Sequence, residues 1–142
     1  MALIYEDKTE ILRRCFFDVQ NEVGLGRQEE DYHSACKVWL SDHDVPFTSK
    51  QPHSLLFQGQ LAHTLYPDLV AWDSITVELK AVPRSPSKTE FVQLFDYLKC
   101  RNDRLGLLVN MGLDRVHVER VVYEQPETTL EENWQYWHGG IS

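Results

Sequence analysis

Residues 66–70 read YPDLV, and residues 75–82 read ITVELKAV. Apolar and polar side chains alternate through the second stretch, which is the pattern of a β-strand. A strand places Thr76, Glu78 and Lys80 on one face, with the last two about 6.6 Å apart along the chain. On a helix, the same spacing would set these two side chains nearly opposite one another. The alternation therefore predicts a strand that carries an acid and an amine on one face.

Asp68 lies in the first of these stretches, at the start of an extended segment expected over residues 68–72. If that segment pairs with the strand of Glu78, the two carboxylates can converge on a hard divalent cation, with the backbone carbonyl of Leu79 as another oxygen ligand. Magnesium suits such a ligand set best. A metal held there would polarise a phosphodiester, and Lys80 would orient or deprotonate the attacking water. These residues thus indicate hydrolytic phosphodiester chemistry.

The same short pattern also has an ordinary structural interpretation. A Glu and a Lys two residues apart on an exposed strand face are a common solvated pair, and Asp after Pro is common in turns. Because such short patterns recur by accident, the pattern alone leaves both interpretations open.

The length and composition suit one compact domain. The chain has 142 residues, of which 42% are hydrophobic and 25% are charged, enough for a single core over residues 1–142. Apolar residues at three- and four-residue steps predict helices over about 7–23, over 29–43, and from the loop after Pro86 to about Arg101.

Extended segments are expected around these helices, and together they predict one sheet in a mixed α/β or α+β arrangement. The first two segments form a hairpin that turns at Gln58-Gly59. The extended segments are residues 53–57, 60–66, 68–72, 75–80, 105–110 and 116–123.

The charge is unevenly distributed along the chain. The net charge of −8 argues against a protein that simply coats nucleic acid. Residues 80–104, however, carry six basic and three acidic side chains. This basic window can face a polyanion, although ordinary solvated helix and loop charges would give the same count.

The three cysteines are widely spaced, so neither a disulfide framework nor a Cys-x-x-Cys metal site is expected. No apolar run approaches the length of a membrane span, and residues 1–7 lack a basic start followed by an apolar stretch. A cytoplasmic protein with no membrane partner is expected.

Several motifs together resemble the PD-(D/E)xK nuclease superfamily. Pro67-Asp68 followed, after nine residues, by Glu78-Leu79-Lys80 is similar to its signature. Residues 26–32 (GRQEEDY) match the Gly-x-x-Glu-x-x-Tyr motif of the GxxExxY proteins, a small branch of that superfamily. Residues 93–99 and 105–112 resemble the family's Gln-bearing helix and the strand that follows it.

The resemblance implies a restriction-endonuclease-like core, a central mixed β-sheet flanked by helices in αβββαβ order. It implies a metal-dependent nuclease that uses Mg²⁺ or Mn²⁺ and acts on nucleic acid, with DNA favoured over RNA. The implied metal ligands are Asp68, Glu78, the Leu79 carbonyl and Glu29. Lys80 becomes the catalytic lysine and Gln93 a polar helper near the scissile phosphate. Tyr32 and Tyr97 are expected to contact these catalytic residues rather than the substrate.

One stretch departs from the family pattern. Residues 63–66 (HTLY) lack the acidic and basic residues that relatives often carry before the motif Asp, so Arg84, Lys88 and Arg101 become the candidates for substrate contacts. Residues 124–142 are expected to form a carboxyl-terminal tail. Its Trp134, Tyr136 and Trp137 favour a helix that seals the core or a homodimer contact over stacking on unpaired bases.

Two alternatives to an autonomous nuclease remain open. The net acidity and the altered 63–66 stretch would also suit a catalytically inactive module of nuclease fold that binds nucleic acid or protein. A domain this small has little area for specific recognition, so it would equally suit a subunit that is active only with a partner.

Overall fold

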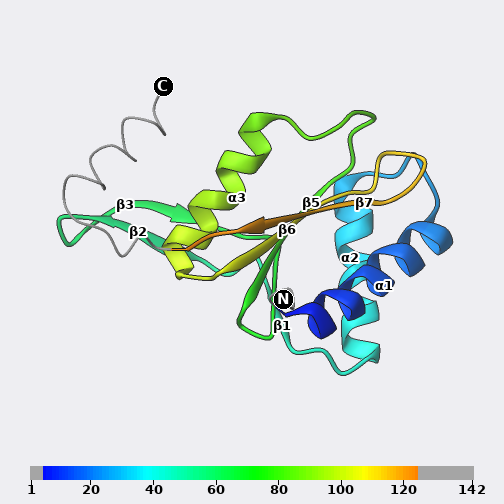
Figure 1. The fold of residues 1–142 in the computed structure, drawn as a ribbon, viewed down its shortest axis with the longest axis horizontal. Coiled ribbons are helices and arrows are strands. Elements are labelled where there is room, and N and C mark those ends of the chain that lie inside the picture. The colour runs from blue at the N-terminus through cyan, green and yellow to red at the C-terminus, as the bar shows by residue number, and fades with distance from the viewer. Residues whose placement is uncertain (1–4, 125–142) are drawn as a thin grey trace.

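The computed structural model describes residues 5–124, and two packed helices begin this part of the chain. Helix α1 spans Glu6–Val23 and α2 spans Glu29–Asp42. The helices expected over 7–23 and 29–43 are therefore confirmed to within one residue at each end. Figure 1 shows both helices on the same side of the central sheet.

The start of α2 is fixed by a reciprocal pair of side-chain contacts. Gln28 accepts a hydrogen bond from the backbone of Asp31, and the Asp31 carboxylate accepts one from the backbone N–H of Gln28. This capping box satisfies amides that have no partner inside the helix. It sets Glu29 in the first turn of α2, where a negative charge is favoured by the helix dipole.

The central sheet has five strands in the order β1-β4-β5-β6-β7. All neighbouring pairs are antiparallel except β5 and β6, which are parallel and joined by helix α3 (Lys88–Arg101). The expected mixed sheet flanked by helices, with a restriction-endonuclease-like core, is confirmed. Its strands are β1 (Phe47–Ser49), β4 (Leu69–Ala71), β5 (Ile75–Lys80), β6 (Leu105–Asn110) and β7 (His117–Val122).

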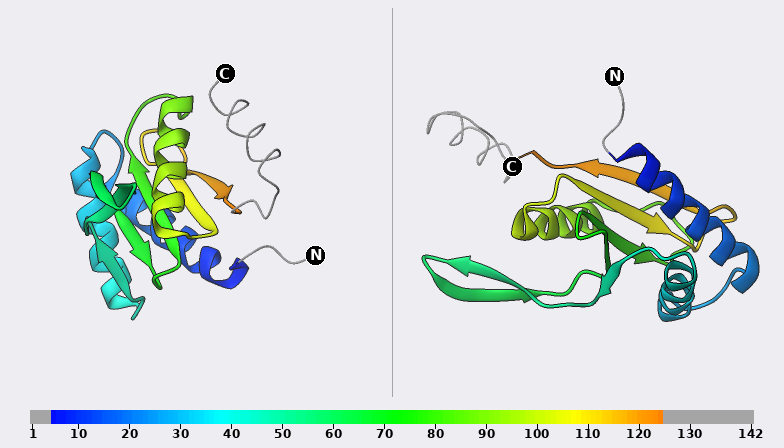
Figure 2. Two further views of the ribbon diagram at one scale, coloured as in Figure 1. Left: turned by 90° about the vertical axis from the view of Figure 1, so that its left-hand side faces the viewer. Right: turned by 90° about the horizontal axis from the view of Figure 1, so that it is seen from below.

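The hairpin expected at residues 53–66 forms, but it does not join the central sheet. Strands β2 (His53–Phe57) and β3 (Gln60–Leu65) pair only with each other, around a turn in which Gln58 and Gly59 both have positive φ. The prediction of one continuous sheet was wrong because β1, a three-residue strand that the sequence pattern did not reveal, takes the edge of β4. In Figure 2 the hairpin extends away from the main sheet.

Strand β5 is buried on both faces, as is usual where a parallel pair lies inside a sheet. Ile75, Val77 and Leu79 pack into the core beneath α1 and α2. The opposite face, with Glu78, is covered by α3, whose Leu94 and Leu98 form a smaller core with Leu108 and Val121. The predicted alternation is therefore present, and Glu78 lies under a helix with only 3% of its surface exposed.

Asn110, at the end of β6, ties down the loop that follows Lys80. Its side-chain oxygen accepts hydrogen bonds from the backbone N–H groups of Val82 and Gly112, at 3.1 and 2.9 Å. Its amide group donates to the carbonyls of Val82 and Arg84, at 3.0 and 2.8 Å. The loop after Lys80 and the segment after β6 approach so closely that a Cβ on Gly112 would lie 2.4 Å from the Val82 backbone.

Replacing Asn110 with alanine is expected to lower the free energy of unfolding by about 2–4 kcal/mol, because backbone groups would lose their hydrogen-bond partner in a buried setting. Urea denaturation followed by circular dichroism measures this change. The matched control is Asn21→Ala on the exposed face of α1, which should stay within about 0.5 kcal/mol of the unsubstituted protein. Equal stability of the two variants would contradict the role assigned to Asn110.

Candidate active site

Asp68 and Glu78 are held together by two hydrogen bonds between the start of β4 and the end of β5. The backbone N–H of Asp68 donates to Glu78 Oε1 at 3.0 Å, and the backbone N–H of Leu79 donates to Asp68 Oδ2 at 2.8 Å. Antiparallel pairing of Leu69 with Val77 places the two acids opposite one another. Within residues 5–124, the second oxygen of each carboxylate receives no hydrogen bond and remains available to a ligand.

The carbonyl of Leu79 points to the same side as these acids. Lys80 accepts a hydrogen bond from the N–H of Met111, so its carbonyl points toward β6. Successive residues of a strand turn their backbone groups to opposite neighbours, and the N–H and C=O of one residue share a side. Because the N–H of Leu79 donates to Asp68, its carbonyl oxygen also faces the β4 side.

The electrostatics of Glu78 reflect burial beside another acid. Desolvation, followed by the negative charge of Asp68, raises the pKa of the Glu78 carboxyl to about 8. The hydrogen bond from the Asp68 backbone and the charge of Lys80 act in the opposite direction. A cation placed against the free oxygens would favour the ionised form of Glu78.

Glu29 reaches the same region from the first turn of α2. Partial desolvation raises the pKa of its carboxyl, while the charges of Lys80 and Asp68 act on it in opposite directions. His33, one helical turn further along α2, contacts the backbone of Asp68. Residues four apart share a helix face, so this contact explains why Glu29 lies over the end of β5. Its side chain keeps substantial contact with solvent.

Lys80 is half-buried at the last position of β5. It shares a strand face with Glu78, as the alternation predicted, and its charge partly opposes the rise in the pKa of both Glu78 and Glu29. The structure thus brings an amine and three carboxyls to one end of β5.

Two residues that the sequence motifs did not reveal support this arrangement. His33 Nε2 lies 3.1 Å from the carbonyl oxygen of Asp68 and 3.0 Å from the hydroxyl of Ser49. The backbone N–H of Lys50 also donates to the Asp68 carbonyl, at 3.2 Å. The signal that could have found His33 is its spacing of four from Glu29. Asn110 is the second such residue, because it bonds the loop that follows Lys80. No local sequence pattern predicts that role.

Gln93 and Tyr97 lie one turn apart on α3, facing the end of the hairpin. The amide of Gln93 donates to the hydroxyl of Tyr97 at 3.1 Å. Desolvation, followed by the charges of Glu78 and Asp68, raises the pKa of Tyr97 to about 12. Tyr97 therefore lies close to both acids, as expected. The side chain of Gln93, expected as a polar helper near the scissile phosphate, is exposed and bonds to Tyr97.

The other sequence candidates lie further from the acids or are engaged elsewhere. Tyr32 is buried between the helices, where its hydroxyl donates to the carbonyl of Gly24 at 2.7 Å. Arg84 forms an ion pair with Glu90 at 2.9 Å, and Lys88 is exposed at the start of α3.

Arg101 lies beside the start of β5, at the opposite end of the strand from Lys80. It forms ion pairs with Asp73 at 2.8 Å and Asp103 at 2.6 Å, and Asp103 also accepts a hydrogen bond from Thr76. Its guanidinium is therefore held by two carboxylates of the fold. The structure does not support the expected contact of Arg101 with substrate.

The donor set suits a hard divalent cation, although it is not a complete cage. Within residues 5–124, no group of three His, Cys, Asp or Glu side chains is close enough to hold a metal ion. Mg²⁺ commonly binds through one or two carboxylates and completes its shell with water and substrate oxygens. The free oxygens of Asp68 and Glu78, with the Leu79 carbonyl on the same side, meet that requirement. Glu29 can join them if its exposed side chain moves closer.

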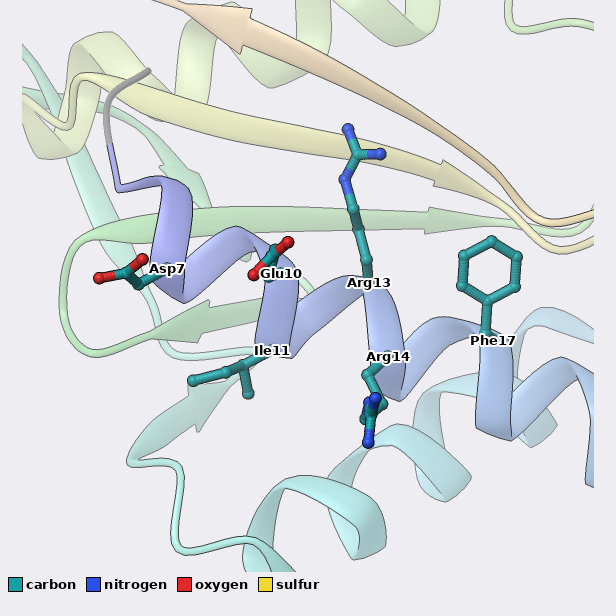
Figure 3. Close-up of a pocket in the computed structure, with 6 residues that line it drawn as sticks. All are labelled: Asp7, Glu10, Ile11, Arg13, Arg14 and Phe17. Atoms are coloured by element: carbon teal, nitrogen blue, oxygen red, sulfur yellow. The ribbon is translucent and has the colours of Figure 1, made fainter. Parts of the chain in front are cut away.

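A separate hollow lies on the outer face of α1 (Figure 3). Acidic and basic side chains of this one helix line it together. Its lining residues are Asp7, Glu10, Ile11, Arg13, Arg14 and Phe17. In the described part of the chain, no helix is long and apolar enough to cross a membrane.

Comparison with known proteins agrees with this geometry. The sequence profile described as the PD-(D/E)XK nuclease superfamily matches residues 6–121. The chain therefore belongs to the PD-(D/E)XK nuclease superfamily. Among curated proteins, none matches the chain.

Two solved structures share the fold. The crystal structure of SSO0001 aligns with a TM-score of 0.53 and 13% identity over 89% of this chain and 80% of that chain. An alkaline exonuclease, LHK-Exo from Laribacter hongkongensis, aligns with a TM-score of 0.51 and 11% identity over 87% of this chain and 73% of that chain. At such identities the likeness concerns the fold alone.

The raised pKa of Glu78 predicts a pH-dependent stability. Its carboxyl titrates near 4.5 in the unfolded chain and near 8 in the folded one, so folding favours the protonated form. The contribution of this carboxyl to the free energy of unfolding is fully present below about pH 4.5 and is lost as the pH rises through about 8. Without divalent metal, Glu78→Gln should therefore raise the free energy of unfolding above pH 8 by about 2–4 kcal/mol.

Urea denaturation at several pH values in the presence of a chelator measures this effect. Glu22→Gln, an exposed acid on α1, is the matched control and should leave the pH profile unchanged. An identical pH profile for Glu78→Gln and the unsubstituted protein would contradict a buried, protonated Glu78.

Proposed function

We propose that this protein is a metal-dependent nuclease that hydrolyses phosphodiester bonds of nucleic acid, with DNA as its substrate in preference to RNA. The observation that carries the proposal is the pairing of Asp68 with Glu78, which leaves an oxygen of each free beside the amine of Lys80. Membership of a nuclease superfamily supports the reaction class. Strongly perturbed acids in such a cluster are typical of functional sites.

The residues that would hold Mg²⁺ or Mn²⁺ are Asp68 and Glu78 through their carboxylates and Leu79 through its carbonyl. Glu29 supplies a further carboxylate. When bound, such an ion stabilises negative charge that develops on phosphate oxygens during hydrolysis. Its charge would also keep Glu78 ionised at neutral pH, offsetting the burial that raises the pKa of this carboxyl.

Lys80 and Gln93 supply the remaining polar groups. The Lys80 ammonium, on the same strand face as Glu78, would donate a hydrogen bond to the attacking water or to a phosphate oxygen. The water oxygen forms a bond to phosphorus as the bond to the leaving oxygen breaks with its electron pair. The water releases its proton to solvent, and the leaving oxygen takes up a proton from solvent. The exposed Gln93 amide, already bonded to Tyr97, can donate its other hydrogen to the phosphate.

The proposed assignment to the GxxExxY branch is supported by what its motif residues do. Gly26 adopts a positive φ of 80° that favours glycine. The Tyr32 hydroxyl donates to Gly24 and accepts from the N–H of Arg27, so it clamps the loop that leads into α2. Gly26 and Tyr32 thus shape the turn that delivers Glu29 to the site.

A second candidate is a nuclease-fold module without turnover, or a subunit that needs a partner for activity. It is favoured by the shortage of free cations: Arg84 and Arg101 are both held in ion pairs. A partner would then supply the surface that binds the phosphate backbone.

The nuclease proposal predicts that Asp68→Asn and Lys80→Met each lower the rate of DNA cleavage by about 100-fold or more, because each removes a group that acts at the scissile phosphate. Cleavage of labelled single- and double-stranded DNA and RNA in Mg²⁺ or Mn²⁺ measures this rate. Excess chelator should abolish it.

The controls are Glu22→Gln and Lys37→Met, which match the changes in charge and lie on α1 and α2, outside the proposed catalytic and metal-binding residues. Both should cleave at the unsubstituted rate. Cleavage that persists unchanged in Asp68→Asn and Lys80→Met would overturn the mechanism. Intact substrates with every variant, despite metal binding, would favour the second candidate.

Metal binding itself gives a test that is independent of turnover. Calorimetric titration with Mn²⁺ should show binding that Asp68→Asn weakens strongly and Glu29→Gln weakens by a smaller factor, about tenfold, since Glu29 approaches from a more exposed position. Glu30→Gln, whose carboxylate pairs with Lys50, is the neighbouring control. Equal affinity for Glu29→Gln and Glu30→Gln would exclude Glu29 as a ligand.

A further inference from the structure

A groove of about 650 Å³ lies between the end of β3 and helix α3, beside the acids. Tyr66 lines it and leaves 54% of its surface exposed, while Val92 across the groove is 48% exposed. Thr64 lines it beside Tyr66, and Thr89, Gln93, Asp96 and Tyr97 line it from α3. Figure 1 shows α3 and the hairpin side by side.

The groove lies next to the candidate active site, because Tyr66 and Tyr97 line it. Tyr97 contributes to its lining and is close enough to Glu78 and Asp68 for their charges to raise its pKa. Tyr66 stands two residues before Asp68 in the chain. A strand bound in the groove would therefore lie near the two carboxylates.

The chemistry of the lining suits nucleobases better than phosphates. It combines the rings of Tyr66 and Tyr97 and aliphatic side chains with neutral hydrogen-bonding groups, among them Gln93, Thr64 and Thr89. No Lys or Arg is among the lining residues, and the carboxylate of Asp96 would repel a phosphate. The same carboxylate can accept hydrogen bonds from the amino groups of bases. Lys88, exposed immediately before Thr89, offers a cation outside the groove for the backbone.

We propose that this groove binds unpaired bases of single-stranded DNA next to the scissile phosphate, with Tyr66 as the ring on which a base stacks. This inference rests on the proposed function and names its substrate class. A volume of this size accommodates a drug-sized ligand, comparable to one or two nucleotides. Bases in a duplex are stacked and paired, so they would have to leave the helix to reach Tyr66.

The test is equilibrium binding of a fluorescent single-stranded DNA of about 12 nucleotides, measured by anisotropy in chelator so that no cleavage occurs. The unsubstituted protein should bind this strand more tightly than the same sequence as a duplex. Tyr66→Ala should weaken binding by about tenfold, because base–aromatic stacking is lost. Tyr66→Phe keeps the ring and should bind within about twofold of the unsubstituted protein.

Phe57→Ala is the control, because this aromatic residue is also exposed but lies at the hairpin turn, outside the groove lining. It should bind as the unsubstituted protein does. Thermal melting of Tyr66→Ala checks that the fold persists, as expected for a side chain that is more than half exposed.

Equal affinity of Tyr66→Ala and the unsubstituted protein would overturn the proposal, as would tighter binding of duplex DNA or of single-stranded RNA. The proposed nuclease function fails separately. If DNA stays intact in Mg²⁺ and Mn²⁺ while Tyr66→Ala still loses affinity, the groove is a base-binding site on a protein without turnover. If cleavage depends on Asp68 but Tyr66→Ala binds single-stranded DNA as tightly as the unsubstituted protein does, the groove assignment alone is wrong.

Discussion

The exchange of hydrogen bonds between Asp68 and the Glu78-Leu79 segment is the contact on which the candidate site depends. One bond uses the backbone of Asp68 and the side chain of Glu78, and the other uses the side chain of Asp68 and the backbone of Leu79. Each acid is thereby fixed by the other's strand. The antiparallel register of β4 and β5 is consequently also the register of the two carboxylates, and a slip of one residue would turn one acid to the opposite face.

This arrangement carries an electrostatic cost. Two carboxyls close together and away from water disfavour simultaneous ionisation, and the raised pKa of Glu78 expresses that cost. Lys80 offsets part of it, and a bound cation would offset more. The fold thus holds its acids in a geometry that is more favourable with a positive ligand than without one, as is expected of a preorganised binding site.

Polar contacts around the acids come from segments that are distant in sequence. His33 on α2 and the backbone of Lys50 hold the carbonyl of Asp68, while Asn110 on β6 anchors the loop after Lys80. On the other side, Tyr97 and Gln93 connect the site to the groove along α3. These contacts lie on both sides of the end of β5, where the free oxygens of Asp68 and Glu78 lie.

Local patterning was sufficient to determine the helices, most strands and the face shared by Glu78 and Lys80, because periodicity of 3.6 or 2 is a property of short segments. The spacing of the Pro67-Asp68 and Glu78-Leu79-Lys80 stretches likewise predicted that Asp68 and Glu78 lie opposite one another on paired strands. Only the tertiary structure decided that β1 displaces the hairpin from the sheet, that Arg101 is engaged by Asp73 and Asp103, and that His33 and Asn110 support the site. These outcomes rest on contacts between residues far apart in the chain, which no local period encodes.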